Sequence, residues 1–575
     1  MSGGVRTGWL AAGASLLTYV GLVVWLTWPL PRHLATDLPI TIATCGFETR
    51  LMSWTLGHQS QALAHDPASL LHGRIYHPAE HALLYTEPGF GALPLFAPVF
   101  LATGNPALAL NVMFLVGISL TAWTLHLVTQ RWTGLWSAGL VAGVAFLTTR
   151  WVTWTWIPAV SSYAMLLYLP LIIWRAASPI RSPTGMLVLA GLVALQGATS
   201  PYVAATILTP LGVLAALRLL RPATRPGAWW LIAALGLAAL VLAGVYSGHA
   251  LLRLEEPTLT DQTYWRGAHG RVFTIPDDLR DPRNPFAVGL PVVVVIAIGM
   301  VIALVRRLTS GRSEPRDTAW RHGVLWAVVG LTIALPPTLS VLGREVWFPP
   351  AALLSSLPAF DLMRDTHRIG IAALFGLCVL VGVAFAECVR GLGIATGTGP
   401  IRRAGCGALA VVMAGLMYQS YAAQGWIRNG RFIPFPDRYR LLPATVPDSP
   451  VLNHLRRSNG PLLELPARLP LVPLMLAAQT RAMYRSLFHP RPILNGYTSY
   501  WPRGFQPRMG LADRLPDADA LTMLRQQTGL ELVLVQLDLM PAARVPVWLD
   551  LADDDARSDL TLVARTPKEL LFRVN

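Results

Sequence analysis

Long apolar stretches separated by short polar segments occupy most of the chain up to about residue 424. A helix rises 1.5 Å per residue, so about 20 apolar residues cross the ~30 Å hydrocarbon layer of a bilayer. Eleven stretches reach or approach that length, at 9–29, 106–126, 134–149, 161–176, 184–198, 202–219, 228–247, 286–305, 323–341, 367–386 and 406–424. The pattern therefore predicts an α-helical polytopic membrane protein with about eleven transmembrane helices.

A further apolar stretch, 89–103, is shorter and contains Pro94 and Pro98. Two interpretations stay open, because a segment of this length either lies in the membrane interface or re-enters the membrane without crossing it. Arginine placement argues against a crossing. If 89–103 does not cross and the N-terminus is cytoplasmic, the arginine-rich short loops all face the cytoplasm, as the positive-inside rule requires. These loops contain Arg131, Arg175, Arg181, Arg218, Arg221, Arg225, Arg306, Arg307, Arg312, Arg316, Arg321, Arg390, Arg402 and Arg403.

In this topology the long segments of mixed charge lie on the opposite, non-cytoplasmic side. They are the first outer loop, 30–105, the links 248–285 and 342–366, and the tail 425–575. The tail has no spanning stretch. It contains strand-like runs at 461–466, 530–536 and 559–573, and they are separated by helical patterns such as 517–527. We therefore expect a transmembrane domain over 1–424 and a small extracytoplasmic α/β domain over 425–575.

Composition supports a membrane protein and excludes other classes. Hydrophobic residues make up 53% of the chain and charged residues 13%, about half the usual charged fraction. The net charge of +15 comes mostly from arginines in short loops, where they set topology, so we expect no nucleic-acid partner. The four cysteines have neither the spacing of a disulfide framework nor that of metal ligands. No metal-ligand motif is present, and a requirement for a divalent metal stays open.

The first outer loop concentrates ionisable side chains at one membrane face. Glu48 is the first candidate for a general base, and Asp37 is the alternative. Residues 50–64, which follow Glu48, have apolar positions at helical spacing and predict a helix in the headgroup region with Trp54 as its anchor. The alternative for Glu48 is a solvated carboxylate or a charge at the N-terminus of that helix.

Three arginines on the outer side are candidates for binding a phosphate, because guanidinium gives bidentate, charge-assisted hydrogen bonds. They are Arg150, Arg364 and Arg368, and the last two lie four residues apart at the start of a predicted helix. The alternative is that they contact lipid headgroups or extend to the interface. The aromatic run 151–156 after Arg150 is typical of an interfacial belt.

Several short motifs in chain order suggest a family. They are Gly46-Phe47-Glu48, Trp54, His65-Asp66-Pro67, Ile75-Tyr76-His77-Pro78, Thr86-Glu87, Thr103-Gly104-Asn105-Pro106, RDTHR at 364–368 and HPRPILNGY at 489–497. In these motifs and in the order of its parts, the chain resembles the GT-C superfamily of membrane glycosyltransferases, which includes the protein O-mannosyltransferases and the lipid A aminoarabinose transferases. It differs at one position, because the expected acid is an Asp directly after the glycine, whereas here Phe47 separates Gly46 from Glu48.

The resemblance implies a transferase, of hexosyltransferase type, that takes a sugar from a polyprenyl-phosphate donor. It implies Glu48 as the base, arginines on the donor phosphate, and Trp54, His58, His77 and Glu87 as residues of the substrate loop. We expect it to act at the outer face of the inner membrane on a glycan, lipid or protein acceptor of the cell envelope. The alternative is a non-catalytic membrane protein that binds or carries lipid-linked sugars. An ion transporter is disfavoured because the predicted spans contain almost no ionisable residues at mid-depth.

Overall fold

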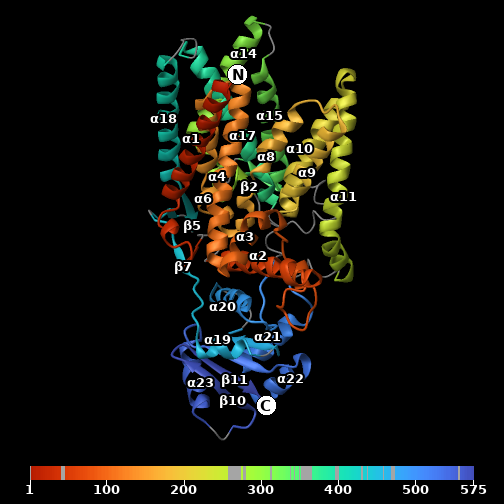
Figure 1. Cartoon of the computed structure of the whole chain (residues 1–575), viewed down its shortest axis with the longest axis vertical. Coiled ribbons are helices and arrows are strands. Elements are labelled where there is room, and N and C mark those ends of the chain that lie inside the picture. Colours follow the sequence, from red (N-terminus) through yellow and green to blue (C-terminus); the bar gives the residue numbers. More distant parts are fainter. Residues whose placement is uncertain are drawn as a thin grey trace. The chain divides into compact units, whose positions relative to one another are not determined.

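The computed structural model is mostly helical, and its chain divides into two compact units (Figure 1). The first, which we call the helical unit, comprises Met1–Arg32, Phe90–Ala92 and Val112–Tyr439. The second, the loop–tail unit, comprises His33–Gly89, Leu93–Asn111 and Arg440–Asn575. The structure describes residues 2–40, 46–256, 273–275, 280–310, 314–336, 338–341, 343–348, 350, 366–394, 400–428, 431–436, 438–457, 459–467, 473–554 and 557–575.

Each apolar stretch that the sequence predicted to span the membrane contains a helix. The helices of the helical unit are α1 (Ser2–Leu26), α4 (Pro106–Thr133, whose first turns belong to the loop–tail unit), α5 (Trp136–Leu147), α6 (Arg150–Thr153), α7 (Trp156–Ala159), α8 (Tyr168–Ala177), α9 (Pro183–Gly197), α10 (Pro201–Leu219), α11 (Arg225–Glu255), α14 (Leu290–Ser310), α15 (Pro315–Ala334), α17 (Ile371–Gly391) and α18 (Pro400–Ala422). Its short strands are β2 (Phe273–Ile275), β3 (Thr338–Val341), β4 (Arg344–Trp347), β5 (Gly425–Arg428) and β6 (Arg431–Pro434).

Within the described residues, six helices are long and apolar enough to cross a membrane: α4, α10, α11, α14, α17 and α18. Several other helices are shorter, and α8 has only 10 residues, about half the length that a bilayer requires. These apolar helices make the chain a polytopic membrane protein, as predicted, while the total of eleven spans stays a prediction. The predicted span 323–341 is shifted, because α15 begins at Pro315 and ends at Ala334, before Pro336.

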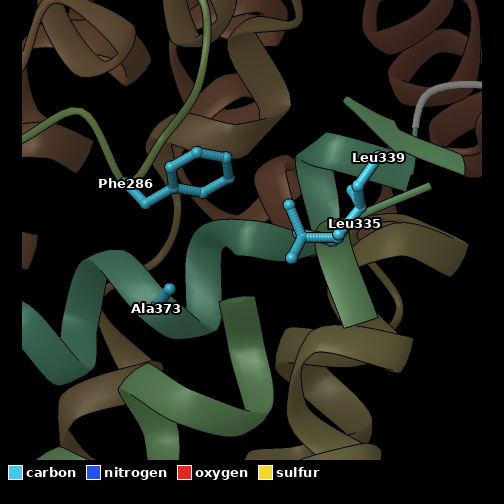
Figure 2. Packing of buried hydrophobic residues seen from close by; sticks show 5 residues of the cluster. Phe286, Leu335, Leu339 and Ala373 are labelled. Atoms are coloured by element: carbon cyan, nitrogen blue, oxygen red, sulfur yellow. The ribbon is translucent and has the colours of Figure 1, made fainter. Parts of the chain in front are cut away.

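Helices α15 and α17 of the helical unit pack closely through small residues. A side chain on Gly330 would clash with the backbone nitrogen of Ala373, and one on Gly376 would clash with that of Ala327. Small residues let helix backbones approach in a membrane, where van der Waals packing drives association. An apolar cluster lies beside this contact (Figure 2), and its buried members are Phe286, Ala334, Leu335, Leu339 and Ala373.

A buried ionic network links α14, α15 and α17. The carboxylate of Glu387 is 1% exposed and lies 2.9 Å from Arg316 Nη1 and 3.3 Å from Arg306 Nη2. Arg306 also contacts Asp317 at 2.6 Å. A buried carboxylate is tolerated when it is paired and hydrogen-bonded, so this network can hold the three helices together.

The loop–tail unit contains a four-stranded sheet with the strand order β10-β11-β9-β8. β8 (Leu462–Leu465) pairs with β9 (Leu532–Gln536) in parallel, and β11 (Glu569–Val574) pairs antiparallel with β9 and with β10 (Leu560–Thr566). β8 and β9 lie within the predicted runs 461–466 and 530–536, whereas the single predicted run 559–573 corresponds to two strands, β10 and β11. The helices of the unit are α2 (Phe47–His65), α3 (Leu93–Thr103), α19 (Pro450–Leu455), α20 (Pro473–Arg485), α21 (Phe505–Arg514), α22 (Ala518–Thr528) and α23 (Val545–Ala552).

The first outer loop and the tail are joined by backbone pairing. Strand β1 (Asp37–Pro39) of the loop pairs antiparallel with β7 (Leu441–Pro443) of the tail. Further along, the N–H of Tyr76 donates to Asn495 O at 3.0 Å, and the N–H of Ile493 donates to Arg74 O at 2.9 Å. The first outer loop and the tail therefore belong to the same compact unit, whereas the domain boundary predicted at residue 424 puts them in different domains.

Candidate functional site

Glu48 lies in the first turn of α2, and its side chain is half-buried. The turn before it requires glycine, since Gly46 has φ +85° and a side chain there would approach Leu442 Cδ2 to 2.8 Å. Thr49 reinforces the turn by donating from Oγ1 to Gly46 O at 2.8 Å. The positive end of the helix dipole favours a negative charge at this position.

The tail provides a hydrogen-bond donor to this carboxylate. The hydroxyl of Tyr497 donates to Glu48 Oε1 at 3.0 Å, and the Tyr497 ring packs edge-on against Phe47 with ring centres 5.5 Å apart. The sequence did not reveal this contact, because 449 residues separate the partners. Its one signal was the tail motif HPRPILNGY, which ends at Tyr497. Phe47, which separates Gly46 from Glu48, takes part in the same contact.

Trp54 is not the membrane anchor that the sequence predicted. Its side chain is 1% exposed, and its indole N–H donates to Ser486 Oγ at 3.1 Å. The helix itself is confirmed, but residues 51–60 are all buried, because α2 packs against α20 and α3 within the loop–tail unit. The apolar positions of α2 are therefore covered by other parts of the protein and not by lipid. A contact of Trp54 with substrate stays a prediction.

The two candidate histidines of the loop make backbone hydrogen bonds. The ring of His58 stacks on Trp54, and its Nε2–H donates to Ser69 O at 3.3 Å. Burial lowers the pKa of His58 to about 4, and the charge of Arg74 acts in the same direction, so the ring is neutral at pH 7. His77 donates from Nε2 to Thr528 O at 3.0 Å, and burial lowers its pKa as well. These contacts favour a role in holding the loop to the rest of the unit.

Asp37 and Glu87 lie at two other places in the loop. Asp37 begins β1, and its Oδ2 accepts from Thr36 Oγ1 at 2.6 Å and from His33 Nδ1 at 3.1 Å. These local bonds suit a carboxylate that fixes a turn. Glu87 is half-buried, and the chain beside it is held to α2 because Gln59 Nε2 donates to Pro88 O at 2.5 Å.

Arg150 begins α6 in the helical unit and is 5% exposed. Its Nε and Nη2 donate to Tyr421 O at 3.1 and 2.8 Å, and the guanidinium lies 3.6 Å from the Tyr421 ring centre and 4.3 Å from that of Phe435. Tyr421 is in the last turn of α18, where helix carbonyls lack partners within the helix. The contacts of Arg150 therefore favour a cap on α18, and phosphate binding by this residue stays a prediction.

Arg368 lies in a short 3-10 helix, Thr366–Gly370, before α17 and is 5% exposed. Its guanidinium carbon is 4.2 Å from the ring centre of Trp156 and 5.1 Å from that of Tyr202. Stacking on aromatic rings stabilises a buried cation and orients its fork of N–H donors. The second arginine of this predicted pair, Arg364, lies outside the described residues.

The aromatic run after Arg150 does not form the predicted interfacial belt. Trp151 and Trp154 are 0% and 5% exposed, and the ring of Trp154 packs against Tyr439, with the centres 4.9 Å apart. These rings therefore belong to the interior of the helical unit, and the Trp154 ring centre lies 5.3 Å from the Arg150 guanidinium carbon.

Among the residues that the structure describes, no group of three or more His, Cys, Asp and Glu side chains could hold a metal ion.

Several solved structures have a fold similar to that of this chain. Arabinofuranosyltransferase AftD from Mycobacteria is similar over 99% of this chain, with 14% sequence identity and a TM-score of 0.52. The match covers 40% of the AftD chain, so this chain spans less than half the length of that protein.

Two other solved structures are similar at lower scores. ArnT from Cupriavidus metallidurans, bound to undecaprenyl phosphate, has 13% identity and a TM-score of 0.46, with 99% of this chain and 98% of that chain covered. The oligosaccharyltransferase of Archaeoglobus fulgidus has 11% identity and a TM-score of 0.39, with 91% and 68% covered. No protein-family profile matches the sequence, and none of the curated proteins matches it.

Proposed function

We propose that the protein is a glycosyltransferase that moves a sugar from a polyprenyl-phosphate donor to a hydroxyl of a cell-envelope acceptor. The observation that carries this proposal is Glu48, a half-buried carboxylate at the start of α2 that accepts a hydrogen bond from Tyr497. The fold similarity to AftD supports it, and the motif that contains Glu48 resembles the one that carries the acidic residue of the GT-C superfamily's first outer loop, although here Phe47 separates Gly46 from the acid.

In the proposed reaction, Glu48 accepts the proton of the acceptor hydroxyl. The acceptor oxygen then forms a bond to the anomeric carbon of the sugar, while the bond from that carbon to the phosphate oxygen breaks and its electron pair leaves with the lipid phosphate. A carboxylate that receives the proton as attack proceeds lowers the barrier by general base catalysis. The helix dipole and the Tyr497 hydroxyl favour the charged form of Glu48 that this step requires.

The departing phosphate needs positive charge, and Arg368 is the described residue best suited to supply it. Its guanidinium is buried against Trp156 and Tyr202, so it is oriented before a donor binds. Arg364 and Arg150 complete the proposed set, with Arg150 the weaker candidate because two of its nitrogens already cap α18.

We place the reaction at the outer face of the inner membrane. The arginine-rich loops then face the cytoplasm, and the first loop and the tail lie outside with the acceptor. Eleven spans, a cytoplasmic N-terminus and an extracytoplasmic tail complete this topology.

The experiment that tests the proposal is deletion of the gene, followed by mass analysis of envelope glycans and of polyprenyl-phosphate sugars. A glycan that lacks one sugar, together with accumulation of the donor, is the expected result. Both changes should reverse on expression of the wild-type chain but not of Glu48→Gln. If Glu48→Gln restored the glycan fully, a carrier of lipid-linked sugars would be favoured over a transferase.

A further inference from the structure

The tail residues Asn495, Gly496 and Tyr497 form a short segment that is anchored on several sides. The side chain of Asn495 pairs with the backbone of β8, because its Oδ1 accepts from the N–H of Glu464 at 2.7 Å and its Nδ2 donates to Glu464 O at 2.8 Å. Asn495 is fully buried. The start of the segment is therefore fixed to the central sheet of the loop–tail unit.

Gly496 is held between α20 and the first outer loop. Its N–H donates to Gln479 Oε1 at 3.0 Å, and Gln479 is itself fully buried on α20. On the other side, any side chain at this position would clash with the ring of Tyr76. Tyr76 is in turn bonded to the segment, since its hydroxyl lies 2.8 Å from Thr498 Oγ1. Only glycine allows the loop and the tail to approach this closely.

Tyr497 follows directly and is 4% exposed. Its N–H points to Met483 Sδ at 3.2 Å, its ring packs on Phe47, and its hydroxyl donates to Glu48 Oε1 at 3.0 Å. Because the neighbouring residues are anchored to β8, α20 and the loop, the hydroxyl is held at a defined place relative to α2. A hydrogen bond donated to a carboxylate orients it and stabilises its charged form.

We propose that Tyr497 is a positioning residue for Glu48, so that the tail supplies part of the catalytic centre. This inference rests on the proposed function, in which Glu48 is the base. The Tyr497 hydroxyl keeps the carboxylate ionised to lower pH and limits its rotation, which a base needs in order to meet the acceptor hydroxyl. A purely structural hydrogen bond would affect stability but would not set the pH at which the enzyme gains activity.

The test is the variant Tyr497→Phe in the full-length protein, which keeps the ring that packs on Phe47 and removes only the hydroxyl. We expect its turnover to fall roughly 10-fold to 100-fold with donor affinity nearly unchanged, in proportion to the loss of one charge-assisted hydrogen bond. The acid limb of its rate–pH profile should move to higher pH. Tyr76→Phe is the matched control, because it removes a buried hydroxyl in the same unit that bonds Thr498, and its acid limb should not move.

A second measurement does not depend on turnover. Carbodiimide reacts with protonated carboxyl groups, so labelling of Glu48 can be followed by peptide mass spectrometry between about pH 4 and pH 8. In Tyr497→Phe, labelling should extend to higher pH than in the wild type and in Tyr76→Phe. An unchanged labelling curve would overturn the inference even if the wild type is an active transferase. If the labelling curve of Tyr497→Phe is shifted but the wild type transfers no sugar, the proposed function is overturned and the Tyr497–Glu48 relationship stands.

Discussion

The guanidinium carbon of Arg150 lies over the ring of Tyr421, 3.6 Å from its centre, and the guanidinium donates two hydrogen bonds to the backbone carbonyl of the same residue. One arginine thereby ties the start of α6 to the last turn of α18. Tyr421 extends the contact, because its hydroxyl lies 3.0 Å from Thr153 Oγ1. Because its hydrogen-bond donors are used in this way, Arg150 mainly stabilises the fold of the helical unit.

We therefore predict that Arg150→Ala lowers stability by about 1–3 kcal/mol, the cost of leaving a buried carbonyl without its partner. Arg150→Lys should recover only part of this, since an ammonium cannot reproduce the planar stack and the paired donors. Thermal unfolding in detergent is the measurement, with Arg32→Ala as the control because Arg32 is exposed. If Arg150→Ala unfolded like the wild type but bound donor poorly, the phosphate role that the sequence suggested would be the correct one.

Substitution of Arg368 should instead weaken donor binding and have little effect on stability. Loss of its bidentate contact with the donor phosphate should weaken donor binding by about 1.5–3 kcal/mol in Arg368→Ala, with a smaller effect on acceptor use. Arg368→Lys should rescue this only in part. Equilibrium binding of a polyprenyl-phosphate sugar to the purified variants measures the effect. Wild-type affinity in Arg368→Ala would remove this residue from the donor site.

The loop–tail unit should lose stability in acid through His58. Its folded-state pKa is about 4 because of burial, whereas an ordinary histidine has a pKa near 6.5. As the pH falls below about 6.5 the unfolded chain takes up a proton that the folded protein does not, so stability present above that pH is lost towards pH 4. The loss amounts to up to about 3 kcal/mol. His58→Gln should unfold with a weaker pH dependence than the wild type over this window, and an equal dependence would contradict the assignment.

Membrane topology can be tested without any assay of activity. A reporter fused after Glu314 should lie in the cytoplasm, and one fused after Asn575 should lie outside. In the predicted topology three spans, at 323–341, 367–386 and 406–424, lie between these points, so the two reporters should lie on opposite sides of the membrane. Finding both reporters on one side would break the proposed topology.

Much of the fold follows from local patterns in the sequence. Apolar stretches predicted the helices, and short apolar runs predicted strands such as β8 and β9, which are buried along their whole length. Trp54 shows the limit of this reasoning. A tryptophan on an amphipathic helix has the same pattern whether lipid or α20 covers it, and only the tertiary structure distinguishes the two.

The candidate site was predictable only in part, for a related reason. Glu48 is marked by a local motif, and Gly46 before it fits the turn that the helix start requires. Tyr497 could not be assigned to Glu48, since no local pattern links residues 449 positions apart. The same holds for Arg150, whose carbonyl partner on α18 depends on how the helices pack.

The central claim is that Glu48 acts as the base, and the most direct measurement is the turnover of Glu48→Gln with purified donor and acceptor. This variant keeps size and hydrogen bonding but cannot accept the proton, so turnover should fall by a factor on the order of 10² to 10⁴ while donor binding stays nearly intact. Glu48→Asp should be more active than Glu48→Gln, and Asp37→Asn should be close to the wild type. Transfer by Glu48→Gln at the wild-type rate would contradict the account, and an inactive Asp37→Asn in the same experiment would move the base to Asp37.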